Sequence, residues 1–219
     1  MKISALFAKK HSFPWVTWSV TLCCIMVTGI SILWPHLYEE LAWSNQPTHL
    51  WQYVSGAFLH GDQNKQLPLT LAHLIVNLLM FIPYGVMIEN LLGHKRFGIT
   101  FLWSWLGTSA VFQIFVYATV PTGAVAYGAG LSGSSFAIIA MGAFILFRIF
   151  LLDKKKFFRQ PLAYIFLSGL IGELSFLHPN VAGISSLIIH LSGIAIGIIC
   201  TVIFRKAIYS SLQTLAERE

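Results

Sequence analysis

The 219-residue sequence has few charged side chains, because Asp, Glu, Lys and Arg together make up only 10% of it. An average soluble domain carries about 25%. Hydrophobic residues make up 56% of the chain, and no segment is polar and long enough to form a second, soluble domain. We therefore expect one membrane domain over residues 14–204, with cytoplasmic tails at residues 1–13 and 205–219.

Cysteine is also scarce. Cys23, Cys24 and Cys200 all lie within apolar runs, where thiols behave as small hydrophobic side chains. They provide neither a disulfide framework nor a zinc site. The histidines outside the apolar runs do not have the spacing of metal ligands. We expect no metal and no cofactor.

Long apolar runs are abundant. A helix of about 20 residues crosses a hydrocarbon core about 30 Å thick, and backbone groups in lipid must bond within their own helix. The segment 35–69 is rich in Trp and Tyr, which is typical of an interfacial loop. The first run is too long for a signal peptide and no small-x-small cleavage site follows it, so we expect it to be retained. The sequence predicts an all-α membrane protein with an interfacial loop between helices 1 and 2 and six transmembrane helices, at residues 14–34, 70–92, 98–119, 129–151, 161–177 and 185–204.

The basic residues indicate how the chain is oriented. The formal charge of +6 comes from Lys and Arg in short loops between apolar runs, a pattern that favours membrane topology over a nucleic-acid partner. If the N-terminus is cytoplasmic, 13 of the 14 Lys and Arg residues lie on that side, and Lys65 is the exception. We expect a multi-pass protein with both termini in the cytoplasm. The short tails favour a prokaryotic plasma membrane.

Four polar side chains lie at similar depth within the predicted spans. They are His73 and Asn77 in the second, Ser132 in the fourth and His190 in the sixth. At a rise of 1.5 Å per residue we place them roughly 5 to 11 Å below the outer boundary. A hydroxyl, two imidazoles and an amide are the parts of an acyl-transfer site, namely a nucleophile, a base and oxyanion donors. The same layer could also be a polar packing cluster.

The surrounding glycines favour the catalytic interpretation. A small-xxx-small pair lets another helix approach closely, and if that helix is the fourth span, Ser132 and His190 come within hydrogen-bond reach. Small residues beside Ser132 keep side chains away from an incoming carbonyl. No Asp or Glu lies at this depth on these helices, so no third triad member is evident. The four glycines are Gly130, Gly133, Gly193 and Gly197.

These residues resemble the motifs of the rhomboid family, and the resemblance extends over most of the chain. It implies a six-helix membrane bundle with a serine–histidine dyad. The segment His73-x-x-x-Asn77, followed by Gly85 and Glu89, is similar to the motif of the family's second helix. Gly130-Leu-Ser132-Gly133 with Ala137 is similar to its nucleophile motif. His190-x-x-Gly193-x-x-x-Gly197 is similar to the motif of its sixth helix.

Carried to this chain, the resemblance implies that Ser132 attacks the scissile carbonyl and that His190 is the general base and acid. It further implies an oxyanion hole formed by His73, Asn77 and the backbone N–H of Ser132. Three features depart from the family pattern. Gln52 follows Trp51 where many members have arginine, Phe136 stands where a tyrosine is usual under the histidine ring, and residues 61–68 are extra. Phe136 keeps the stacking, so we expect activity to survive.

The main hypothesis is an intramembrane serine endopeptidase, without a cofactor, that cleaves single-span or other membrane proteins within or beside a transmembrane segment. The alternatives are a non-catalytic rhomboid relative that binds membrane proteins and, less favoured, a small transporter that uses the polar layer. Glu89 is expected to bond backbone or hydroxyl groups of adjacent helices. Glu173 and the loop 178–184 are candidates for controlling access.

Overall fold

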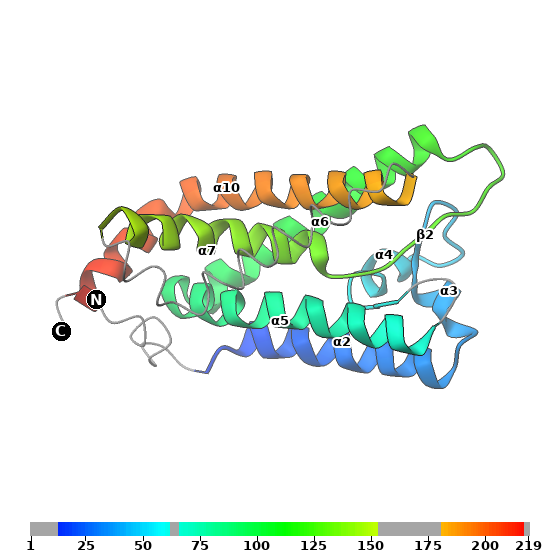
Figure 1. Cartoon of the computed structure of the whole chain (residues 1–219), viewed down its shortest axis with the longest axis horizontal. Helices are drawn as coiled ribbons and strands as arrows, with labels where there is room; N and C mark the ends of the chain where they lie inside the picture. Colours follow the sequence, from blue (N-terminus) through cyan, green and yellow to red (C-terminus); the bar gives the residue numbers. More distant parts are fainter. Residues whose placement is uncertain (1–12, 62–65, 153–180, 217–219) are drawn as a thin grey trace.

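The computed structural model describes residues 13–61, 66–152 and 181–216. Within these residues the long helices run side by side along the longest dimension of the molecule, and the short helices and strands gather at one end (Figure 1). The long helices are α2 (Trp15–Leu33), α5 (Leu67–Leu92), α6 (His94–Thr119), α7 (Ser132–Leu152) and α10 (Val181–Ala216).

The apolar composition of these helices identifies an integral membrane protein. α2, α5, α6 and residues Ile184–Gln213 of α10 are long and apolar enough to cross a membrane, and α7 is apolar over Ser132–Phe147. The spans predicted at 14–34, 70–92 and 98–119 correspond to α2, α5 and α6. The span predicted at 161–177 lies outside the described residues, as do Glu173 and residues 178–180 of the predicted outer loop.

Two helices differ in their bounds from the predicted spans. α7 begins at Ser132 and not at residue 129. Residues 127–128 form a strand, and the φ of 130° at Gly130 is not helical, so the helix can start only after this glycine. α10 covers residues 181–216 and not 185–204. The apolar run ends near residue 204, but the helix continues because Ile208 is fully buried and the Ser211 hydroxyl donates to the Leu91 carbonyl at 2.8 Å.

The end of the bundle that carries the short elements contains α3 (Leu37–Leu41), α4 (Gln52–Ser55), β1 (Trp43–Ser44) and β2 (Tyr127–Gly128). The two strands are antiparallel, with Trp43 opposite Gly128 and Ser44 opposite Tyr127. This pairing joins the segment after α2 to the segment that leads into α7. It fixes the chain four residues before the predicted nucleophile.

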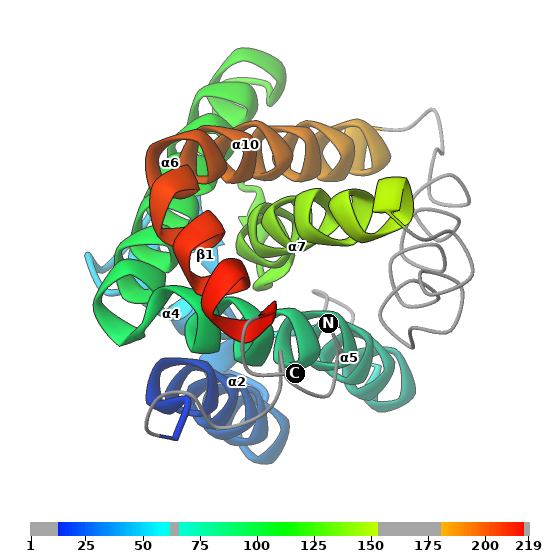
Figure 2. The ribbon, with the colours of Figure 1, turned by 90° about the vertical axis from the view of Figure 1, so that its left-hand side faces the viewer.

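α7 is the central helix of the described bundle. Viewed along the helices, it lies between α10, α6 and α5 (Figure 2). The core between α5 and α7 is filled by fully buried large side chains, and Gly142 makes room for them, because a Cβ there would lie 2.3 Å from the ring of Tyr84. The buried residues are Phe81, Tyr84, Met87, Ile138, Met141 and Ile145.

Glu89 joins α5 to the start of α2. Its carboxylate accepts the backbone N–H groups of Val16 at 2.9 Å and Thr17 at 2.8 Å, and the Thr17 hydroxyl at 2.7 Å. His94 Nδ1 lies 2.6 Å from the same carboxylate. The first N–H groups of a helix lack intrahelical acceptors and favour a negative charge. The role expected for Glu89 is therefore confirmed: it caps a neighbouring helix.

Candidate active site

Ser132 is the first residue of α7, and the two residues before it shape its surroundings. The Gly130 N–H donates to the Gly56 carbonyl at 2.9 Å, which ties this segment to the end of α4. The φ of 130° at Gly130 lies in the region that favours glycine. A Cβ there would stand 3.3 Å from Cε1 and Nε2 of His73. Glycine therefore permits the His73 ring to lie against the segment that leads into α7.

The position of Ser132 at a helix N-terminus matters for its backbone. The first N–H groups of an α-helix have no acceptor within the helix, and they point toward a ligand at the N-terminus. The Ser132 N–H belongs to this group because α7 starts at Ser132. A negatively charged oxygen placed beside the serine side chain would meet this donor.

His190 lies on α10 and faces α7. Its ring stacks on Phe136, with 4.4 Å between ring centroids and an interplanar angle of 23°. Phe136 is four residues after Ser132 and shares its helix face. His190 is buried, with 8% of its surface exposed. The stacking therefore holds the imidazole against the face of α7 that carries Ser132.

The backbones of α7 and α10 touch where the sequence places its glycines. A Cβ on Gly193 would lie 2.2 Å from the Gly133 carbonyl oxygen, and one on Gly197 would lie 2.2 Å from the Ala137 carbonyl oxygen. Neither position can hold a larger side chain without a shift of the backbone. The close approach expected between the sixth and fourth predicted spans is thus present between α10 and α7.

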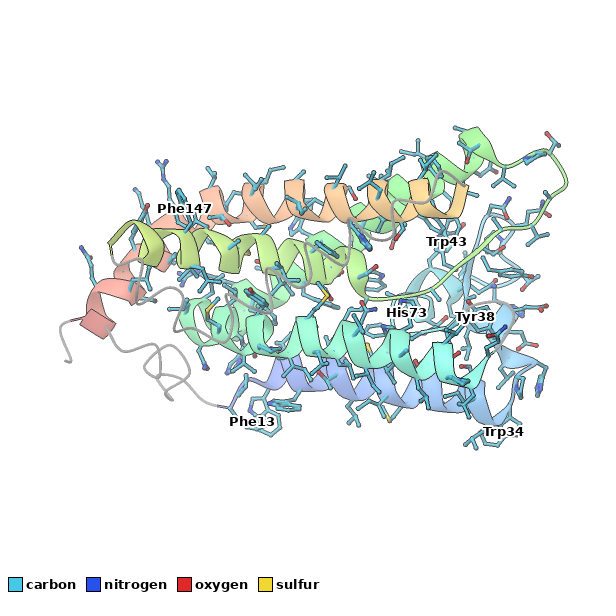
Figure 3. The ribbon with its side chains drawn as sticks, in the orientation of Figure 1. Phe13, Trp34, Tyr38, Trp43, His73 and Phe147 are labelled. Carbon is cyan, nitrogen blue, oxygen red and sulfur yellow. The ribbon has the colours of Figure 1, made fainter. Side chains whose placement is uncertain are left out.

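His73 lies on α5 and faces the segment that leads into α7 (Figure 3). Its Nδ1 accepts the Gly61 N–H at 3.2 Å, so in the neutral ring the hydrogen is on Nε2, which together with Cε1 forms the edge of the ring that faces Gly130. Asn77, one turn further along α5, is buried and donates from Nδ2 to the His73 carbonyl at 3.0 Å. An amide nitrogen has two hydrogens, so one remains for another acceptor.

A cavity of about 400 Å³ opens beside Ser132. Its wall is contributed by α5, α6, α7, α10 and both strands, and includes His73 and Gly130. Asn77 and His190 are buried and do not form part of the wall. Hydroxyl groups also line it, from Thr108, Ser109, Ser134, Ser185 and Ser186.

Gln52 occupies the position where the family pattern has arginine, and its amide orders the loop between α2 and α5. Nε2 donates to the Glu39 carbonyl at 2.8 Å and to the Ala42 carbonyl at 3.1 Å. Oε1 accepts the His49 N–H at 2.9 Å and the Thr48 hydroxyl at 3.3 Å. A buried neutral amide with four partners therefore supports the loop without a charge.

His60 is a residue to which the sequence assigned no role. Its ring is fully buried and lies edge-on to that of His73, with 5.1 Å between centroids. Burial, together with the neighbouring His73, lowers the pKa of His60 to about 3. The signal that could have drawn attention to it is its position directly before the extra residues 61–68.

The described residues contain no group of three or more His, Cys, Asp or Glu side chains that could hold a metal ion. The arrangement around Ser132 consists of a hydroxyl, imidazoles, an amide and a helix N-terminus. Such groups can transfer protons and bind an oxyanion.

Comparison with known proteins agrees with the motifs. The model of the Rhomboid domain matches residues 47–207, well over half of the chain. No curated protein matches it. This family consists generally of intramembrane serine proteases and also includes inactive members. The chain therefore belongs to the rhomboid family.

Proposed function

We propose that the protein is an intramembrane serine endopeptidase, with Ser132 as nucleophile and His190 as general base and acid. The observation that carries the proposal is the stacking of His190 on Phe136, one turn from Ser132, which itself lines the cavity. A serine hydroxyl becomes an effective nucleophile when a neighbouring base takes its proton.

In this mechanism His190 accepts the proton of the Ser132 hydroxyl while Oγ bonds to the scissile carbonyl carbon. The carbonyl oxygen becomes an oxyanion that accepts hydrogen bonds from the Ser132 N–H, His73 Nε2–H and Asn77. His190 then gives its proton to the leaving amine as the C–N bond breaks. A water molecule hydrolyses the acyl-enzyme with the same two proton transfers.

The substrate is a membrane protein whose chain enters the cavity in an extended form. A transmembrane helix hides its peptide bonds, so the segment must unwind locally before Ser132 can reach it. Small or helix-breaking residues near the cleavage point lower the cost of unwinding. Phe136 orients His190 in the place of an acidic third residue.

The proposal includes the topology expected from the sequence. Both termini face the cytoplasm of a prokaryotic cell, six helices span the plasma membrane with the fifth near residues 161–177, and the site opens toward the outer side. Gly193 and Gly197 support the site by allowing α10 to approach the backbone of α7, and Gly130 and Gly133 support it by leaving room for neighbouring side chains.

The test is cleavage of a labile single-span substrate by the full chain in lipid vesicles. We expect Ser132→Ala and His190→Ala to abolish cleavage, and Ser192→Ala to retain it, because the Ser192 hydroxyl bonds the Ile189 carbonyl within its own helix at 2.7 Å. Labelling by a fluorophosphonate should likewise require Ser132 and His190. Full cleavage by both dyad variants contradicts the mechanism, and substrate binding by the wild-type protein without cleavage or labelling indicates the non-catalytic alternative.

A further inference from the structure

The His60 ring has a defined donor and a defined acceptor. Its Nδ1 lies 3.2 Å from the Phe58 carbonyl oxygen, which can only accept, and 3.4 Å from the Thr28 hydroxyl, which can accept as well as donate. Both contacts are satisfied when Nδ1 carries the hydrogen, so we assign it there. The backbone N–H of His60 donates to the Thr28 hydroxyl at 3.1 Å, which holds the residue against α2. The lowered pKa keeps the ring neutral. His60 Nε2 is therefore a hydrogen-bond acceptor.

This acceptor is buried, and in the part of the chain that the structure describes it has no hydrogen-bond partner. Nearly all buried polar atoms of native proteins bond either protein or ordered water. A cavity of about 160 Å³ is lined by His60 and, among others, by the hydroxyl-bearing residues Ser31, Tyr38 and Thr70. One buried water needs roughly 10–15 Å³ of such space and two to four polar partners. The cavity offers both.

The cavity is linked to the oxyanion side of the site through the peptide that follows His60. The Gly61 N–H is the group that donates to His73 Nδ1. The Gly61 carbonyl accepts the Tyr38 hydroxyl at 3.4 Å, and a Cβ on Gly61 would lie 2.7 Å from the Thr70 hydroxyl. Two hydroxyls of the cavity wall therefore contact the residue that fixes the hydrogen of His73 on Nε2.

We propose that this small cavity is a water site, that its water donates a hydrogen bond to His60 Nε2, and that His60 held in this way is a positioning residue for His73. The chain of contacts runs from the water through His60 and the Gly61 N–H to His73. The positioning half rests on the proposed function, because it matters only if His73 stabilises an oxyanion. The hydration half stands without it.

Nitrogen NMR of the full chain in lipid nanodiscs tests the hydration half. With ¹⁵N in the histidine rings, and His60 assigned by loss of its signals in His60→Asn, we expect hydrogen on Nδ1 and an Nε2 shift typical of a hydrogen-bonded acceptor. Thr70→Val should move the Nε2 signal toward that of an unbonded nitrogen, and Thr119→Val, a matched change at an exposed helix position, should not. An unbonded Nε2 or a hydrogen on Nε2 in the wild-type protein overturns the proposal, whatever the activity.

Cleavage kinetics test the positioning half. Asparagine can donate where Nδ1 donates but has no acceptor at the place of Nε2, so we expect His60→Asn to lower kcat roughly tenfold with KM nearly unchanged, less than the loss of a whole oxyanion donor. The effect should disappear in a His73→Ala background, because His60 acts through His73. An equal loss in both backgrounds overturns the positioning role. If His60→Asn does not fold, Thr70→Val in the two backgrounds makes the same comparison.

The two proposals fail separately. Cleavage that survives Ser132→Ala would remove the proposed mechanism and with it the meaning of the kinetic comparison. The ¹⁵N shifts would still decide whether the cavity is hydrated.

Discussion

Alanine substitutions at Gly193 and Gly197 should reduce cleavage by separating α10 from α7. A Cβ at either position would lie 2.2 Å from a backbone carbonyl oxygen of α7, whereas ordinary contact begins at 3.4 Å. The helices must therefore move apart by about 1.2 Å at the contact. A backbone carbonyl cannot relieve the clash by a rotamer change as a side chain can, so the two helices must be displaced relative to each other.

The size of the effect follows from this displacement. A misplacement of about 1 Å at a catalytic group can lower a rate about 100-fold, and overfilling a packed core costs about 1–3 kcal/mol of stability. We expect Gly193→Ala to lower kcat by about 100-fold, because it presses on Gly133, the residue next to Ser132. Gly197→Ala, one turn further from the dyad, should lower kcat less while destabilising the fold similarly.

The assay is single-substrate cleavage in vesicles, together with thermal unfolding in detergent. Gly29→Ala is the matched control, because a Cβ there has nothing within 4 Å and alanine favours the helix. We expect this variant to match the wild type in kcat and to unfold at the same or a higher temperature. Wild-type kcat in Gly193→Ala would refute the view that backbone contact between the two helices sets the dyad geometry.

Further predictions concern the cap, the stacked ring and pH. Glu89→Gln should lower the free energy of unfolding by about 2 kcal/mol, because hydrogen bonds from the α2 N-terminus lose a charged acceptor, while kcat of the folded protein stays unchanged; an unchanged melting temperature would count against the cap. Phe136→Tyr should keep kcat within about twofold, whereas Phe136→Ala should lower it about two- to tenfold, since a stacked pair contributes about 0.5–1.5 kcal/mol; equal kcat in both variants would exclude a role for stacking. His60 titrates near 6.5 when unfolded and near 3 when folded, so the unfolded chain binds more protons between these values and stability should fall as the pH decreases through this window. Chemical unfolding from pH 7 to pH 4 measures this, and His60→Asn should show a smaller dependence; an equal dependence would assign the acid sensitivity to other groups.

The helices could be predicted where apolar length alone decides the structure. α2, α5 and α6 follow from runs of about 20 apolar residues, since lipid leaves the backbone no other partner. The C-terminal end of α10 could not be predicted in this way. Arg205 and Lys206 end the apolar run, yet the helix continues because Ile208 and Ser211 find partners on α5 and in the core. The end of α10 depends on tertiary contacts, which a hydropathy profile of the sequence does not predict.

The sequence proposes a set of residues for the candidate site, but it does not contain their geometry. Depth counted from each helix start placed Ser132 a few residues inside its helix, whereas it is the first residue of α7. The difference matters chemically, because only a residue in the first turn offers a backbone N–H to an oxyanion. The signal that would have corrected the boundary is Gly130, whose φ of 130° marks the end of the preceding loop.

The hydrogen bonds of the loop between α2 and α5 could not be predicted from the sequence, because they are made by uncharged groups. Arginine at the position of Gln52 would bring a charge and five donors, whereas Gln52 supplies two donors and an acceptor that are matched to four loop atoms. His60 likewise gains its importance from burial, which no local pattern reveals. A sequence comparison that searched for the missing arginine would therefore conclude that the loop is weakened. The hydrogen bonds indicate instead that this chain orders the loop with an uncharged amide group. Gln52→Ala removes all four of these bonds and should therefore disorder the loop.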